Sequence, residues 1–160
     1  MESEVLINPK LANEMNGRRA TASDVKLLTQ SIIEFDVPDW LINTLLKYNL
    51  VDVELSTTAE NDKSGQGVYL KWKTAKDMVN ELYEFYPGVA VISLSCLPIA
   101  DCMDGSGDPY FIKINSSKND SPVVRIRHDL VEDDDTYLES NLEIVSVNLE
   151  SFFRSCKIKN

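Results

Sequence analysis

The stretch Ala100–Ile114, "ADCMDGSGDPYFIKI", joins an acidic, glycine-bearing loop to a strand of alternating apolar residues. Loops of this composition hold metal ions, cradle phosphates or turn the chain. Gly105 and Gly107 permit positive φ angles in a tight turn, and Pro109 stands where a strand begins and a missing N–H is tolerated. The stretch therefore predicts a structural turn that leads the chain into a strand.

A calcium-binding interpretation of the same loop fails at defined positions. An EF-hand loop that began at Asp101 would need an acidic or amide side chain at its third and fifth positions and a glutamate at its twelfth. Met103, Gly105 and Ile112 occupy these positions. A nonclassical calcium site stays open as an alternative, and its candidate ligands are Asp101, Asp104 and Asp108.

A phosphate-binding interpretation fails as well. A dinucleotide fingerprint that began at Gly105 would need a third glycine where Tyr110 stands, and a helix rather than a strand would have to follow. The G-K-[ST] sequence of a P-loop is also absent from the chain. The structural turn is the interpretation that accounts for every residue of the loop.

Outward from this turn, helical and strand-like patterns alternate irregularly along the chain. Helices are expected in residues 21–35, 36–50, 75–86 and 149–157, with Thr21 or Ser23, Thr74 and Asn148 as N-caps. Strands are expected in residues 50–56, 67–73, 89–97, 109–114, 122–128 and 141–147. The pattern predicts an α+β fold, in which helices flank a mixed but mainly antiparallel sheet. We expect residues 1–20 to form a flexible N-terminal arm and residues 21–160 to form a single domain.

Composition and charge narrow the class of protein. The chain has 160 residues, of which 43% are hydrophobic, and this is enough to bury roughly 68–70% of the unfolded surface. Its formal net charge is −10, opposite in sign to that of a typical nucleic-acid binder, so direct nucleic-acid contact is not expected. No signal peptide or membrane span is apparent. Three scattered cysteines, without a C-x-x-C pair, favour a reducing cytoplasm and neither a zinc site nor disulfides.

Catalytic patterns are sparse. His128, the only histidine, stands beside Asp129, but no G-x-S-x-G nucleophile motif accompanies them. The 26 acidic residues could supply a carboxylate pair for a hydrolase, yet nothing in the sequence selects two of them. Catalysis by His128 or by such a pair stays the weakest hypothesis.

An acid-rich segment near the C-terminus is the remaining feature. Residues 128–153 contain no lysine or arginine and include four consecutive acids, which repel one another and favour an exposed loop. The segment is either a solvated face or a contact surface for a basic partner. The candidate partner-binding residues are Asp129, Glu132, Asp133, Asp134, Asp135 and Glu139.

Three motifs, taken in order, resemble the SUKH superfamily, which includes yeast Smi/Knr-type regulators and many bacterial immunity proteins. "DVPDWLINTLLKY" is similar to an early family helix, "GSGDPYFIKI" to the turn that enters a central strand, and "LEIVSVNLESFF" to the closing strand and helix. Together they fall within residues 22–156, almost the whole chain.

The resemblance implies a cytoplasmic binding module without enzymatic activity or cofactor. Bacterial members typically neutralise a polymorphic toxin made by a neighbouring gene, often a nuclease, whose cleft is basic because it must attract phosphate. The expected partner is therefore a basic toxin domain, and the chain itself is expected to be a monomer or a weak dimer. A regulatory or scaffold protein of the same fold, acting in signalling or cell-wall control, is the alternative.

Overall fold

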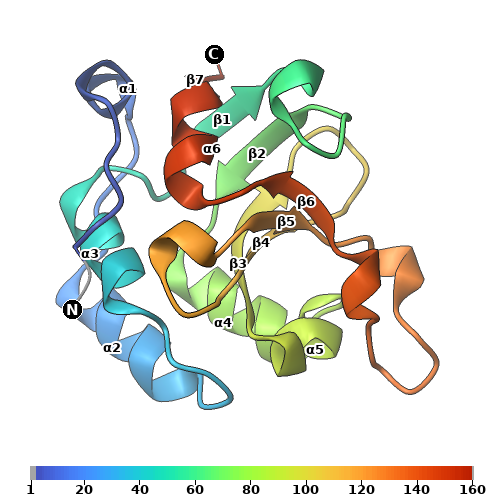
Figure 1. The fold of residues 1–160 in the computed structure, drawn as a ribbon. Helices are drawn as coiled ribbons and strands as arrows, with labels where there is room; N and C mark the ends of the chain where they lie inside the picture. The colour runs from blue at the N-terminus through green and yellow to red at the C-terminus, as the bar shows by residue number, and fades with distance from the viewer. Residues whose placement is uncertain (1–2, 160) are drawn as a thin grey trace.

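Seven strands form one antiparallel sheet in the computed structural model of the chain, which describes residues 3–159 (Figure 1). The strand order is β6-β5-β4-β3-β2-β1-β7, so six strands follow one another as a meander and the last strand closes the opposite edge. The bounds are β1 Glu54–Thr57, β2 Val68–Trp72, β3 Cys96–Cys102, β4 Tyr110–Lys113, β5 Val123–Arg125, β6 Glu143–Ser146 and β7 Lys157–Ile158.

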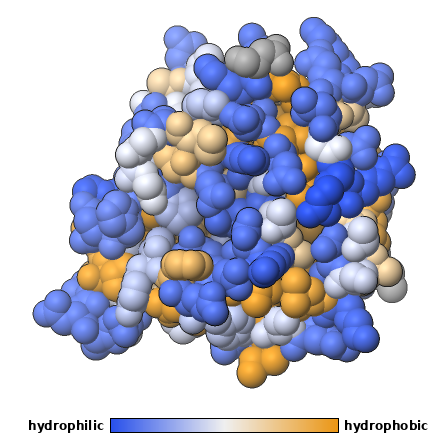
Figure 2. All heavy atoms as spheres, turned by 180° about the vertical axis from the view of Figure 1, so that it is seen from behind, coloured by the Kyte–Doolittle hydropathy of each residue, from blue (hydrophilic) through white to orange (hydrophobic). Residues whose placement is uncertain are grey.

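Within residues 3–159, six α-helices pack around this sheet. Their bounds are α1 Pro9–Glu14, α2 Ala22–Ser31, α3 Asp39–Lys47, α4 Ala75–Glu84, α5 Gly88–Val91 and α6 Leu149–Ser155. The expected caps Thr21, Thr74 and Asn148 each accept a backbone N–H of the first helical turn through their side chains. From behind, Figure 2 shows apolar groups along the lower part of a mainly polar face, at the level where Figure 1 has α2, α4 and α5. The α+β class, with helices flanking an antiparallel sheet in one domain, is confirmed.

The central strands are buried on both faces. Tyr110, Phe111 and Ile112 are all fully buried, and alternation along β4 sends them to opposite sides of the sheet. Tyr110 and Ile112 join the larger apolar cluster, which includes side chains of α3, α4 and α6. Phe111 joins a second cluster, which includes side chains of α5 and the buried Tyr137.

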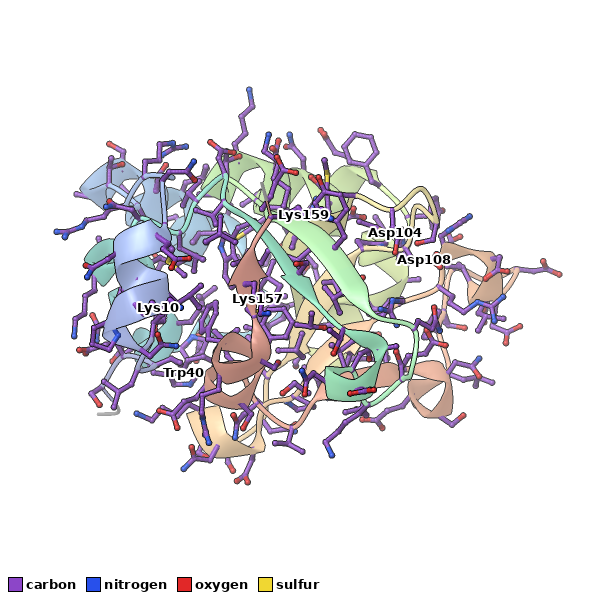
Figure 3. The ribbon with its side chains drawn as sticks, turned by 90° about the horizontal axis from the view of Figure 1, so that it is seen from above. Lys10, Trp40, Asp104, Asp108, Lys157 and Lys159 are labelled. Atoms are coloured by element: carbon purple, nitrogen blue, oxygen red, sulfur yellow. The ribbon has the colours of Figure 1, made fainter. Side chains whose placement is uncertain are left out.

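The N-terminal segment differs from the expected loose arm. Val5, Ile7, Leu11 and Met15 are each at most 6% exposed and belong to the larger cluster. Within the segment lies α1, which contacts β7, the edge strand that sequence patterns did not indicate. Figure 3 shows the two side by side, with Lys10 on α1 and Lys157 on β7. A six-residue helix and a two-residue strand are too short to leave a clear periodic pattern.

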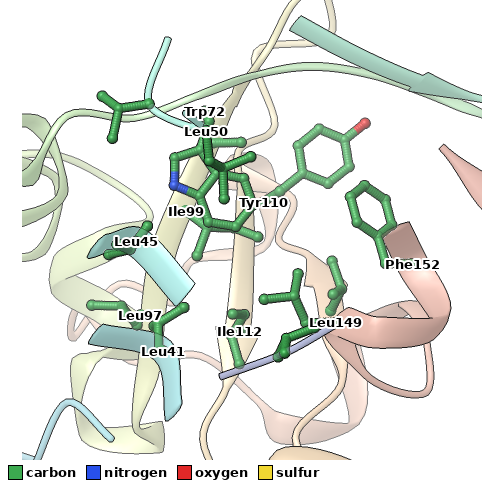
Figure 4. Close-up of a cluster of buried hydrophobic side chains, with 14 of the residues drawn as sticks. Leu41, Leu45, Leu50, Trp72, Leu97, Ile99, Tyr110, Ile112, Leu149 and Phe152 are labelled. Carbon is green, nitrogen blue, oxygen red and sulfur yellow. The ribbon is translucent and has the colours of Figure 1, made fainter. Parts of the chain in front are cut away.

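The larger cluster contains the major aromatic packing of the core. Trp72 and Phe153 stack with ring centroids 5.9 Å apart, which ties β2 to α6. Figure 4 shows Leu41 and Leu45 on α3 facing the strands that carry Leu97 and Ile112.

Residues 89–97 were expected to form a strand, and only their end does so. Val89 N–H donates to the Phe85 carbonyl at 3.0 Å, so the chain continues in helical turns as α5 before β3 begins. A Cβ atom at Gly88 would lie 1.8 Å from the Glu81 carbonyl oxygen, so α5 starts in direct backbone contact with α4. The apolar run is buried here without strand pairing. For short apolar runs of this kind, periodicity alone does not distinguish a helix from a strand.

Within residues 3–159, no helix combines the length and the apolar character that crossing a bilayer requires.

Because the N-terminal segment is buried, shortening an apolar side chain of α1 should lower the free energy of unfolding substantially. Leu11→Ala removes a side chain that is 4% exposed, and we expect the free energy of unfolding to fall by about 2–5 kcal/mol. Leu6→Ala is the matched control because Leu6 lies in the same segment but is 62% exposed, and its effect should stay within about 0.5 kcal/mol. Urea unfolding measures both, and equally small effects would mean that the segment is only loosely attached.

Candidate functional site

Residues 131–137 form a tight, protruding turn, here called the acidic hairpin. Glu132 N–H donates to the Thr136 carbonyl at 2.8 Å, and Asp135 N–H donates to the Glu132 carbonyl at 3.0 Å. Tyr137, which is 5% exposed, anchors its end in the cluster around Phe111. In Figure 1 the hairpin is the orange loop that extends past α5. The sheet therefore holds the base of the hairpin and leaves its tip in solvent.

The six candidate partner-binding residues are all exposed, but the structure divides them into two groups. Asp129 is paired with Arg127, whose Nη2 lies 2.8 Å from Oδ2, and Glu139 lies 3.6 Å from the ammonium group of Lys113. Within residues 3–159, no ion pair is found for the remaining four candidates. These four, all in the acidic hairpin, are Glu132, Asp133, Asp134 and Asp135.

Hydrogen bonds orient two carboxylates of the hairpin. The Thr136 hydroxyl donates to Asp134 at 2.6 Å, and this bond lowers the pKa of the Asp134 carboxyl. The Tyr86 hydroxyl donates to Asp135 at 2.8 Å, which links the hairpin to the segment that follows α4. Asp135 adopts a positive φ of 63°, a conformation that aspartate tolerates better than most side chains. The hairpin thus has a defined conformation that these hydrogen bonds hold.

The loop between β3 and β4 forms the expected structural turn. Gly105 and Gly107 have φ angles of 91° and 76°, in the left-handed region that favours glycine. Asp104 accepts hydrogen bonds from the Cys102 thiol and from Ser106 N–H, and the thiol contact lowers the pKa of Asp104. The turn is therefore closed by its own side chains.

The open calcium alternative is not supported by this arrangement. The three carboxylates have separate partners: Asp101 pairs with Lys73, Asp104 bonds within the turn, and Asp108 bonds to His128. Figure 3 shows Asp104 and Asp108 near each other on this loop. Across residues 3–159, no group of three or more His, Cys, Asp or Glu side chains is placed to hold a metal ion.

His128 also forms hydrogen bonds with the loop between β3 and β4. Asp108 Oδ1 lies 2.6 Å from His128 Nδ1 and accepts the backbone N–H of His128 at 3.0 Å. Asp108, and not the adjacent Asp129, is thus the carboxylate partner of this ring. Burial raises the pKa of the Cys96 thiol to about 12, so this cysteine is not poised as a nucleophile.

A buried ionic cluster that the sequence analysis missed lies under the loop between β1 and β2. Arg125, 2% exposed on β5, donates to Asp62 at 3.0 Å and to the Gly67 carbonyl at 2.8 Å. Its guanidinium also lies 5.1 Å from the ring of Tyr110 and bonds to that hydroxyl. Burial raises the pKa of Tyr110 to about 12. The cluster pins the loop to the sheet, and an arginine inside the apolar strand "PVVRIRH" was its only signal in the sequence.

Removing one partner of this buried pair should destabilise the fold. Asp62→Ala removes the carboxylate that hydrogen-bonds the buried Arg125 and leaves only Glu143, 3.9 Å from Nη1, to balance its charge. We expect the free energy of unfolding to fall by about 3–5 kcal/mol. Asp129→Ala is the matched control, because it removes an aspartate from an exposed arginine pair and should cost at most about 1 kcal/mol. Urea unfolding distinguishes them, and equal losses would refute the structural role assigned to Asp62.

A second, partly buried ionic group joins the end of β2 to β3 and α4. Lys73, 6% exposed, contacts Asp101 and lies 4.0 Å from Glu81 Oε1. Glu81 also accepts the Gly88 N–H at 3.2 Å. Burial raises the pKa of the Glu81 carboxyl, with the nearby Lys73 charge opposing the shift. These contacts give Glu81 a structural role in holding α5 against α4.

The raised pKa of Glu81 predicts a pH-dependent contribution to stability. The unfolded carboxyl ionises near 4.5, whereas the folded protein retains the proton to higher pH. The contribution is therefore complete below about 4.5 and is lost as pH rises through the folded pKa. Urea unfolding of the protein and of Glu81→Gln from about pH 4 to about pH 8 tests this. Wild-type stability should fall relative to the variant as pH rises, and a constant difference would contradict the assignment.

A mainly apolar groove of about 600 Å³ lies where α1, α3 and α6 meet. Its two cations have partners within the chain. Lys47 lies 2.8 Å from Glu4, and Arg154 lies 3.3 Å from Glu150. Both cations thus already face a carboxylate, and none of the residues that line the groove belongs to the acidic hairpin.

The aromatic residues at the end of α4 lie beside the hairpin. Tyr83, Phe85 and Tyr86 are 39%, 55% and 54% exposed. The Tyr83 hydroxyl accepts the Ile33 N–H at 3.3 Å and donates to Glu34, while Tyr86 reaches Asp135. These contacts bring α2, α4 and the acidic hairpin to one surface.

The chain matches no model of a known protein family, no curated protein and no solved structure. Its function is therefore inferred from its own residues and their geometry.

Proposed function

We propose that the chain is a non-enzymatic, immunity-type binding protein of the SUKH class that neutralises a basic toxin domain, a nuclease by preference, through protein–protein contact. The observation that carries the proposal is the acidic hairpin. Its four consecutive acids are exposed, are free of ion pairs within residues 3–159 and are held in a defined turn by backbone hydrogen bonds.

Electrostatics gives this hairpin a physical role. Oriented acids on a chain of net charge −10 attract a basic surface over a Debye length of about 8–10 Å. Such steering raises association rate constants toward about 10⁸–10⁹ M⁻¹s⁻¹ at low salt and suppresses contact with acidic partners. A cleft built to attract nucleic acid is positively charged and fits this requirement.

The shape of the hairpin adds to the charge argument. Because Tyr137 and the turn hydrogen bonds fix the loop before any partner arrives, little conformational entropy is lost on binding. Asp129 and Glu139 are already paired with Arg127 and Lys113, so we assign them to the edge of the contact surface. Glu132 to Asp135 are assigned to its centre.

Charge reversal tests the proposal. The binding probe is the product of the neighbouring gene, which the proposal expects to be a basic toxin domain, and Asp133→Lys with Asp134→Lys is the variant. We expect association at low salt to slow by about tenfold or more, and its dependence on salt to weaken. Stopped-flow fluorescence at several ionic strengths gives both quantities.

A matched control separates local from overall charge. Glu14→Lys with Glu60→Lys changes two exposed acids outside the hairpin, so each double variant moves the formal net charge from −10 to −6. The control should retain nearly the wild-type rate. Equal slowing in both variants would mean that overall net charge sets the association rate and that the hairpin is only a solvated face. Unchanged rates in both would contradict the proposal. A cognate partner from cell-wall or signalling machinery, with no toxin bound, would favour the alternative scaffold function.

A further inference from the structure

Beside the acidic hairpin lies an exposed surface of rings and carboxylates, here called the Tyr83–Tyr86 patch. Its apolar members are Ile33, Tyr83, Phe85 and Tyr86, which are 39% to 81% exposed. Its acidic members are Glu34, Glu84 and Asp135. Hydrogen bonds connect the patch to two other segments, because Tyr83 bonds to Ile33 and Glu34 while Tyr86 bonds to Asp135.

The patch draws its residues from three stretches of the chain that contain no lysine or arginine. These stretches are residues 27–46, 77–112 and 128–153, and they supply the end of α2, the end of α4 and the acidic hairpin. Segments far apart in the sequence therefore converge on a single surface that combines apolar area with negative charge. An apolar surface rimmed by one sign of charge is complementary to a partner that carries the other.

The ends of two helices add to this negative potential. α2 ends at Ser31 and α4 at Glu84, and the Ile33–Tyr83 hydrogen bond places these C-termini together. Neither helix has a basic residue in its last turn to offset the partial negative charge of its terminal carbonyl groups. The rings therefore lie in a field that favours a cation.

Two of the rings are held by the carboxylates that flank them. Glu34 accepts the Tyr83 hydroxyl, and Asp135 accepts the Tyr86 hydroxyl at 2.8 Å, which fixes both rings. An arginine guanidinium is planar, stacks on aromatic faces and bonds carboxylates through two parallel N–H groups. A lysine ammonium lacks the plane and the fork. The arrangement of ring beside carboxylate thus discriminates between the two cations.

From this geometry we infer that the Tyr83–Tyr86 patch is an arginine-recognition surface, on which a basic protein partner stacks arginine side chains against Tyr83 and Tyr86 and pairs them with Glu34 and Asp135. The inference rests on the proposed function and deepens it. The acidic hairpin attracts the partner over distance, and the patch supplies the short-range anchors. Tyrosine and arginine are the residue types most enriched at such anchoring positions.

Two defined peptides test the inference without the toxin. Acetylated, amidated tetra-arginine and tetra-lysine are titrated into ¹⁵N-labelled protein, and amide shifts are followed by NMR. The arginine peptide should bind about two- to fivefold more tightly, and its largest shifts should include residues 33–34 and 83–86. In Tyr83→Leu with Tyr86→Leu, which keeps apolar bulk but removes the two rings that lie beside carboxylates, both peptides should bind equally. Val147→Ala, at a 48% exposed site outside the patch, should retain the arginine preference.

The possible failures are distinguishable. Equal affinity of the two peptides for the wild-type protein would overturn the inference, as would an arginine preference that survives loss of both rings. Shifts confined to residues 131–137 would also overturn it, while leaving the acidic hairpin as a charge-based contact. The proposed function is judged separately by the association rate of the toxin domain.

Discussion

Two-sided burial of the central strands is the constraint on which the rest of the structure depends. Tyr110, Phe111 and Ile112 are consecutive and fully buried, so neither face of β4 can meet solvent. Side chains of α3 and α6 cover one face of the strand. Side chains of α5 and the buried Tyr137 cover the other. The antiparallel meander follows, because each new strand pairs with the last and continues the two apolar faces.

The proposed interaction surface is a consequence of that second face. Tyr137 packs against Phe111, and this contact determines where residues 131–137 leave the sheet. The helical turns after α4 cover the same face, so the exposed ring of Tyr86 comes to lie beside the hairpin. Core packing thus places acidic and aromatic groups together, although they are about fifty residues apart in the chain.

Local signals in the sequence predicted much of the fold, and long-range contacts account for what they missed. Asn148 was predicted to cap α6 because capping depends on the next three residues only. Leu11 was assigned to a loose arm because six helical residues carry no periodicity, yet tertiary packing buries it. Arg125 and Asp62 pair across 63 positions, and Lys113 reaches Glu139 across the second face. Arg125 stands out inside an apolar strand, but neither its partner nor the Lys113–Glu139 pairing leaves a local trace in the sequence. The candidate acids could therefore be named but not ranked.

Hydrogen–deuterium exchange of the chain with and without the basic toxin domain tests the central claim most directly, because it locates the contact surface on the unmodified protein. The account predicts slowed exchange in residues 131–137 and in residues 83–89, with little change around the groove between α1, α3 and α6. Slowed exchange confined to that groove, with the acidic hairpin unaffected in the complex, would contradict it.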